Sequence, residues 1–112
     1  MIKLVYCITR RPDLSPDEFL RYWREVHAPI GARIPGVKRL VHSLAIDVPG
    51  DARSGDFDGM AELWFESIGA LLKARRSEEW RQSTADEANF IDHSKVAYFV
   101  TEEYEVNIHG QL

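Results

Sequence analysis

The chain has 112 residues, 45% of them hydrophobic and 29% charged, which is typical of one folded domain rather than of a disordered or membrane-embedded chain. Fourteen basic against eighteen acidic residues give a formal charge of -4, which argues against nucleic acid as a partner because phosphates require a basic surface. The single cysteine, Cys7, excludes an internal disulfide and a centre with several thiolate ligands. We expect one cytoplasmic domain over residues 1–112, since the apolar run at 4–8 is too short for a secretion signal and no stretch approaches membrane-spanning length.

The first two elements are predicted from local signals. Residues 2–9 are rich in β-branched and aromatic side chains and predict a strand. Ser15 is a good N-cap for a following helix, Pro16 fits the first helical position, and Glu18 lies where a capping box needs its acceptor. The helix start is therefore well defined.

The middle of the chain predicts the end of this helix, a long strand and a loop. Pro29 is expected to disturb the helix after His27, because proline lacks the amide hydrogen that a helix needs. Residues 37–48 predict a strand, and the glycines and alternating charges of 49–56 predict a mobile loop.

The second half of the chain repeats the strand and helix pattern. A strand is predicted over 59–66, Ser67 and Ser77 are N-caps for two helical stretches, and a last strand is predicted over about 95–106. The order β-α-β-β-α-β predicts an α+β, ferredoxin-like fold, with a four-stranded antiparallel sheet and helices on one face.

Both faces of this sheet are predicted to be apolar. In the first strand Val5 and Cys7 alternate with Leu4, Tyr6 and Ile8, and the third and fourth strands show the same pattern. A monomer would expose more apolar surface than soluble proteins usually tolerate, so we expect a homodimer in which two sheets face each other as a closed barrel.

Two histidines are candidates for chemistry. His27 borders the buried stripe of the first helix beside Tyr22 and Trp23, where it can act as a general acid or base or simply tie the helix end to the sheet. His42 lies in phase with apolar neighbours on a strand, which fits either a pocket or a satisfied core position.

Glu62 shares a strand face with Met60 and Trp64. A carboxylate between large apolar residues needs a partner. We favour an ion pair with Arg33 or Arg39 and keep substrate binding as the alternative.

Cofactor signals are weak. His27, His42 and Glu62 would have to converge in space to bind a metal, since no pair of ligands has metal-site spacing on one element. Haem ligation by a single histidine stays open. The sequence has no phosphate-binding glycine loop and no nucleotide fingerprint, so we expect no cofactor.

Two motifs carry a family resemblance: Tyr22-Trp23-x-x-x-His27-x-Pro29 and Asp58-Gly59-x-x-Glu62-x-Trp64-Phe65. Together with the stretch at 86–92 they resemble the EthD family, a branch of the dimeric α+β barrel proteins. The resemblance implies a ferredoxin-like protomer, a dimer, and one pocket per protomer between sheet and helices. It also implies proton transfer on small cyclic or aromatic substrates without metal or organic cofactor, as in fungal dehydratases and a methylmuconolactone isomerase, with His27 at the family histidine. His42 stands where many relatives have glutamine or a similar polar residue.

The leading hypothesis is therefore a cofactor-independent isomerase or lyase acting on a small hydrophobic carbonyl, lactone or phenolic compound. His27 would move a proton, and Tyr6 or His42 would stabilise the oxyanion. The residues expected to bind substrate are Tyr22, Trp23, Met60, Glu62, Trp64 and Phe99. The alternatives are a monooxygenase related to quinol or haem chemistry and a non-catalytic protein that binds a hydrophobic metabolite.

Overall fold

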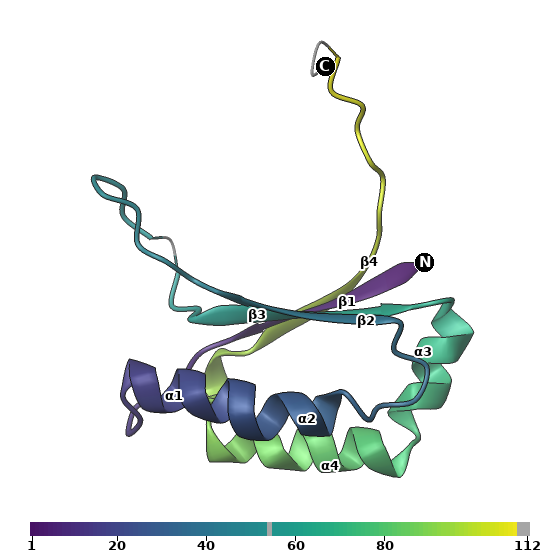
Figure 1. The fold of residues 1–112 in the computed structure, drawn as a ribbon, viewed down its shortest axis with the longest axis horizontal. Coiled ribbons are helices and arrows are strands. Elements are labelled where there is room, and N and C mark those ends of the chain that lie inside the picture. The colour runs from purple at the N-terminus through teal and green to yellow at the C-terminus, as the bar shows by residue number, and fades with distance from the viewer. Residues whose placement is uncertain (54, 110–112) are drawn as a thin grey trace.

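A computed structural model describes residues 1–53 and 55–109, so one residue of the predicted loop at 49–56 and the last three residues of the chain lie outside the described part. This part forms a four-stranded sheet with helices on one face (Figure 1). The strands are β1 (Ile2–Ile8), β2 (Arg39–Leu44), β3 (Gly59–Phe65) and β4 (Ala97–Glu102). Their spatial order is β2-β3-β1-β4, and every neighbouring pair is antiparallel, which confirms the predicted ferredoxin-like fold.

The helical layer consists of α1 (Pro16–Tyr22), α2 (Ala28–Gly31), α3 (Ile68–Arg75) and α4 (Glu78–Asp86), with 3-10 turns η2 (Glu87–Asn89) and η3 (His93–Lys95) after α4. The predicted capping box begins α1: the Ser15 hydroxyl accepts the amide hydrogen of Glu18, and the Glu18 carboxylate accepts that of Ser15. The hydroxyls of Ser67 and Ser77 accept the amide hydrogens of Ala70 and Trp80 and so cap α3 and α4, without the reciprocal bond of a capping box. Across the described residues, the helices are too short or too polar to cross a bilayer.

Pro29 changes the helix as predicted, but it widens the helix instead of ending it. Residues Trp23–His27 form a π-helical turn, η1, and the amide of Ala28 donates to the carbonyl of Trp23, five residues back. Because proline cannot donate a hydrogen bond, the wider turn lets the chain continue directly into α2. Trp23 and His27 therefore stay buried on one continuous helical segment.

Two strands are shorter than predicted. The structure ends β2 at Leu44, which pairs with the first residue of β3. Beyond it the Ala45 amide still donates to the Asp58 carbonyl at 2.9 Å, and Val48 then bridges to Asp51 within the loop instead of to β3. Likewise β4 ends at Glu102, which pairs with Ile2 at the start of β1, so the strand predicted at 95–106 loses its ladder there. Apolar alternation continues in both segments, but the length of the neighbouring strand sets where pairing stops.

The core lies between the sheet and the helices. Its largest fully buried side chains are Trp23, Phe19, Phe65, Phe90 and Ile8. The even-numbered side chains of β1 and the odd-numbered side chains of β3 face this layer, since paired residues of neighbouring strands share a face. This face of the sheet is called the inner face below.

The opposite, outer face is mixed rather than uniformly apolar. Val5 and Phe99 pair across it, and Phe99 is 53% exposed. Glu62 lies beside Val5 on β3 and forms an ion pair with Lys3 at 2.8 Å. The predicted pairing of Glu62 with Arg33 or Arg39 is therefore wrong. The Arg39 guanidinium instead lies over the Trp64 ring, 4.7 Å from its centroid.

Candidate active site

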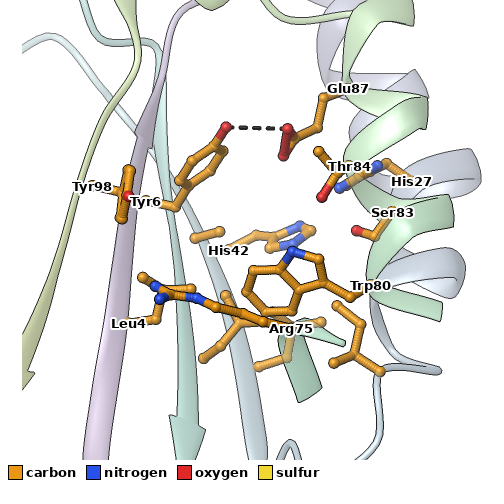
Figure 2. A pocket seen from close by; sticks show the side chains of 15 residues that line it. Leu4, Tyr6, His27, His42, Arg75, Trp80, Ser83, Thr84, Glu87 and Tyr98 are labelled. Carbon is orange, nitrogen blue, oxygen red and sulfur yellow. Dashed lines mark hydrogen bonds between the residues drawn. The ribbon is translucent and has the colours of Figure 1, made fainter. Parts of the chain in front are cut away.

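A cavity of about 390 Å³ lies between the inner face of the sheet and helices α2 and α4 (Figure 2). Tyr6, His27 and His42, the three residues predicted to take part in chemistry, all line it. They come from β1, η1 and β2, which are far apart in sequence and meet only through the fold. Its size suits a small organic molecule.

His27 is held by a carboxylate. Its Nδ1 lies 2.9 Å from Oδ2 of Asp86, at the end of α4, and both side chains are about 11% exposed. An ionised carboxylate accepts a hydrogen bond and cannot donate one, so the proton of neutral His27 belongs on Nδ1. The other ring nitrogen, Nε2, is then unprotonated and available to the cavity, which is the arrangement a general base requires.

Asp86 is ionised at neutral pH. Burial acts to raise the pKa of Asp86, but hydrogen bonds from Tyr22, His27 and Asn89 outweigh it and place the pKa of this carboxyl below its usual range. The Tyr22 hydroxyl donates to Oδ1 at 2.6 Å, and the Asn89 amide donates to the same oxygen at 3.1 Å. Oδ1 is thus occupied by these donors while Oδ2 orients His27.

A second hydrogen-bonded pair, Tyr6 and Glu87, lines the same cavity. The Tyr6 hydroxyl donates to Oε1 of Glu87 at 3.1 Å, and Nε2 of His93 lies 3.3 Å from the same oxygen (Figure 2). Burial is the main cause that raises the pKa of both Tyr6 and Glu87 above their usual values. Tyr6 therefore stays a phenol whose proton points to Glu87, and Glu87 takes up a proton more readily than an ordinary glutamate.

His42 is kept neutral. Burial is the main cause that lowers the pKa of His42 from 6.5 to about 4, and its neighbours His27 and Arg24 act in the same direction. Its ring stacks on the Trp23 indole with centroids 4.4 Å apart and an angle of 13° between the planes. A neutral imidazole fixed in this way can donate a hydrogen bond to a substrate oxygen. Because the Tyr6 proton is engaged by Glu87, His42 is the freer donor of the two candidates for oxyanion stabilisation.

The low pKa of His42 predicts that the protein loses stability between pH 6.5 and pH 4. In this range the unfolded chain binds a proton at His42 that the folded chain does not, so the free energy of unfolding falls as the pH falls. The expected loss is about 1–3 kcal/mol, because the ring is only partly removed from water. Urea unfolding at several pH values measures it, with His42→Gln as the comparison. An equal pH dependence of both proteins would contradict this assignment.

Trp23 and Tyr22, expected to bind substrate, lie behind the cavity instead. Trp23 is only 2% exposed and supports His42 from the far side of its ring. Tyr22 packs against Phe90 and gives its hydroxyl hydrogen to Asp86. Both residues position the groups that face the cavity.

The remaining four expected substrate-binding residues lie on the outer face of the sheet: Met60, Glu62, Trp64 and Phe99. Alternation along β3 and β4 directs their side chains away from the helices, so the sheet separates them from the cavity. Met60 lines a separate hollow of about 260 Å³ together with Cys7. The Trp64 indole donates to Glu103 at 2.6 Å. The placement of Glu62 also means that it does not converge with the two histidines as a metal site would require.

Helix α4 supplies a row of cavity residues that the sequence analysis did not assign to the site. Trp80, Ser83, Thr84 and Glu87 follow the i, i+3, i+4, i+7 spacing of one helical face, and all four line the cavity. That spacing is visible in the sequence and marks a face with hydroxyls and a carboxylate in place of apolar side chains. Asp86 carries no such signal, because its contacts with Tyr22 and His27 arise only when the two helices pack together.

The chain belongs to the EthD family. Residues 11–94 match the family model, the EthD domain. An uncharacterized 11.0 kDa protein from the thcB–thcC intergenic region of Rhodococcus erythropolis is 31% identical over 89 residues, which cover 80% of this chain and 84% of the relative. The predicted resemblance is thereby confirmed.

Solved structures share the fold over nearly the whole chain. An EthD family protein from Bacillus halodurans is 23% identical, with a TM-score of 0.78, and the match covers 93% of this chain and 99% of the other. A dimeric ferredoxin-like protein of unknown function from Bacteroides fragilis is 15% identical, with a TM-score of 0.66 and coverage of 91% and 95%. SnoaB, a cofactor-independent oxygenase from Streptomyces nogalater, is 15% identical, with a TM-score of 0.63 and coverage of 94% of each chain. At these low identities the structures establish the shared fold alone.

Proposed function

We propose that this protein is a cofactor-independent isomerase or lyase that moves a proton on a small hydrophobic carbonyl, lactone or phenolic compound. The observation that carries the proposal is the contact between His27 and Asp86 at the wall of the cavity. A histidine whose Nδ1 is held by an ionised carboxylate presents a basic Nε2 and gains stabilisation when it becomes charged. The neutral His42 adds a hydrogen-bond donor within the same cavity.

The proposed reaction begins with transfer of a proton from the carbon next to the substrate carbonyl to Nε2 of His27. The electron pair of that C–H bond moves onto the carbonyl oxygen, which accepts a hydrogen bond from His42. In an isomerase, His27 returns the proton to a different carbon. In a dehydratase, the electron pair returns to expel a β-hydroxyl group, which leaves as water after it takes a proton from Glu87 or from His27.

Replacement of His27 by alanine is expected to lower turnover by about 10²- to 10⁴-fold, because it removes the base. Lactones and polyketide-like phenols are incubated with the protein in D₂O, and NMR records product formation together with deuterium exchange next to the carbonyl. Exchange reports proton abstraction even where no product accumulates. His109→Ala, an exposed histidine of the tail, is the matched control and should behave as wild type. Equal rates in His27→Ala and wild type would remove His27 from the mechanism.

A cofactor-independent oxygenase is the second candidate, supported by the fold shared with SnoaB. Its first step also needs a base, which here removes the O–H proton of a phenolic or quinol substrate. The resulting phenolate carries electron density on a ring carbon, and this anion then reacts with O₂. Oxygen uptake that depends on His27 would favour this candidate over the isomerase or lyase. Binding with neither exchange nor oxygen uptake would favour a protein that carries a metabolite.

We also propose that the protein works as a homodimer in which a second copy covers the outer face of the sheet. Two segments extend beyond the sheet on this side, the loop between β2 and β3 and the tail after β4 (Figure 1). Exposed apolar side chains occur in both, including Ile46 and Val48 in the loop and Tyr104 and Val106 in the tail. The dimeric Bacteroides fragilis protein with the same fold supports the proposal.

Phe99→Asp is expected to convert the dimer to a monomer, because it places a charge in the middle of the proposed interface. Native mass spectrometry and light scattering at micromolar concentration measure the assembly. Ile68→Asp is the matched control, since Ile68 is 60% exposed but lies at the start of α3 in the helical layer. A monomeric wild-type protein, or dissociation by Ile68→Asp alone, would contradict the proposed interface.

A further inference from the structure

The cavity has two chemically different ends (Figure 2). Glu87 and the hydroxyl of Tyr6 lie at one end, and the side chain of Arg75 reaches across the other end toward Leu4. Between them stand the two histidines and the Trp80 ring. The proposed proton transfer uses the first end and the middle and gives no role to the arginine.

The positive charge of Arg75 has no ion-pair partner among the residues that the structure describes. It is the last residue of α3, and its guanidinium lies 5.9 Å from the centroid of the Trp80 ring. Within residues 1–53 and 55–109, no carboxylate lies within ion-pair distance of it, whereas Arg81 on the next helix pairs with Glu78. The Trp80 contact holds the guanidinium at the cavity and leaves its hydrogen-bond donors free for another group.

The surroundings of Arg75 favour an anion with an apolar body. Leu4 and the Trp80 ring lie at this end, and the strand register places Leu63 and Leu40 beside Leu4 on the same face of the sheet. A planar guanidinium binds a carboxylate through two parallel hydrogen bonds. In the reverse orientation the substrate carboxylate would lie beside the carboxyl group of Glu87 and would have no cation to bind, so the Arg75 end is favoured.

We propose that Arg75 binds the carboxylate of a substrate whose apolar ring or chain fills the cavity. This placement extends the proposed function, because it leaves the opposite end of the substrate beside His27 and His42. The substrates are then small aromatic or alicyclic acids that also carry a carbonyl or phenol group. A position at the end of α3 also suits a cation that only interacts with the helix dipole, and the experiment separates the two roles.

The test compares 2-naphthoate with 2-naphthamide, which have nearly the same shape and differ in charge. Isothermal titration calorimetry measures the affinity of each for wild type, Arg75→Gln, Arg75→Lys and Arg76→Gln. Wild type should bind naphthoate about ten-fold more tightly than naphthamide, and Arg75→Gln should lose this preference while it keeps its affinity for naphthamide. Arg75→Lys should keep part of the preference. Arg76, the exposed neighbour that does not line the cavity, is the matched control and should not change it.

Three results would overturn the proposal. The first is that wild type binds the two compounds with equal affinity or binds neither. The second is a preference for naphthoate that persists in Arg75→Gln. The third is an equal loss of this preference in Arg76→Gln, which would indicate that the general positive charge of this surface, rather than Arg75, attracts the anion. His27→Ala distinguishes this inference from the proposed function. If the preference for naphthoate is intact in this variant and no compound undergoes proton exchange in wild type, the carboxylate site stands and the catalytic proposal fails.

Discussion

Asp86→Asn is expected to lower proton transfer at His27 by about 10²- to 10³-fold while the fold stays intact. The carboxylate accepts a hydrogen bond from Nδ1–H of His27, with Nδ1 and Oδ2 2.9 Å apart, and so keeps the proton on Nδ1 and leaves Nε2 free for the substrate. An asparagine amide can donate its own hydrogen to Nδ1. That exchange moves the imidazole proton to Nε2, where it blocks the base, and it also removes the negative charge that stabilises the charged ring.

Two measurements separate this effect from a loss of structure. Nitrogen-15 chemical shifts of the imidazole report which ring nitrogen of His27 carries the proton, and deuterium exchange into the substrate reports the rate. Tyr22→Phe is the control, because it removes the 2.6 Å bond to Oδ1 of Asp86 and leaves the Oδ2 contact with His27. This variant should lose no more than a few-fold in rate. Wild-type exchange and an unchanged tautomer in Asp86→Asn would contradict the proposed role of the carboxylate.

Local sequence signals predicted where the helices begin but not where the strands end. The capping box at Ser15 and Glu18 depends on residues three positions apart, so the sequence contains all of it. The end of β4 depends on Ile2 at the start of β1, and no property of residues 103–106 themselves indicates it. The π-helical turn before Pro29 could be predicted only in part. The proline indicates that the helix is disturbed, but tertiary packing determines that the disturbance is a wider turn rather than a helix end.

Only part of the candidate site could be predicted, because some of its features are local in the sequence and others depend on the pairing of distant segments. Tyr6, His27 and His42 can be recognised in the sequence because each is a polar or aromatic side chain within an otherwise apolar pattern. All three line the cavity. The sequence analysis also predicts Trp64 and Phe99 as site residues. The register of β1 with β3 and β4 instead places both side chains on the outer face, away from the cavity. Register depends on pairing between distant segments, so it is difficult to derive from one sequence.

Asp86 and Glu87 illustrate a further limit of sequence analysis. They are adjacent at the end of α4, yet Asp86 contacts His27 on η1 and Glu87 contacts Tyr6 on β1. Neighbouring helical residues point in directions about 100° apart, which allows one dipeptide to serve both groups. The two roles become visible only when η1 and β1 are both packed against α4.

Trp23→Ala is expected to cost about 3–5 kcal/mol of folding free energy and to change the chemistry of His42 as well. Trp23 is 2% exposed, and its ring packs against Phe19, His42 and the backbone of Gly59. Its removal leaves a space beside His42 that water can enter. Since burial is the main cause of the low pKa of His42, that pKa should rise from about 4 toward 6.5. Protonation near pH 6 would then remove the neutral donor that the proposed reaction uses.

Gly59→Ala is a milder variant that perturbs the packing of Trp23 from the side of the sheet. A Cβ atom at this position would lie 2.7 Å from two atoms of the Trp23 ring and 2.9 Å from the carbonyl oxygen of Ser43, so the ring or the strand must shift. We expect a cost of about 1–3 kcal/mol and a smaller rise in the pKa of His42. If Trp23→Ala does not fold, this variant still tests the contact.

Urea unfolding followed by circular dichroism at one fixed protein concentration measures the stability change, which keeps any effect of assembly constant. An NMR titration of the His42 ring measures its pKa. Trp64→Ala is the control, because it removes an equally large ring that contacts Arg39 on the outer face, the side of the sheet opposite the cavity. It should lower stability and leave the pKa of His42 near 4. A similar rise of that pKa in both tryptophan variants would show that global loosening exposes His42, and an unchanged pKa in Trp23→Ala would show that the sheet and α4 alone keep the ring neutral.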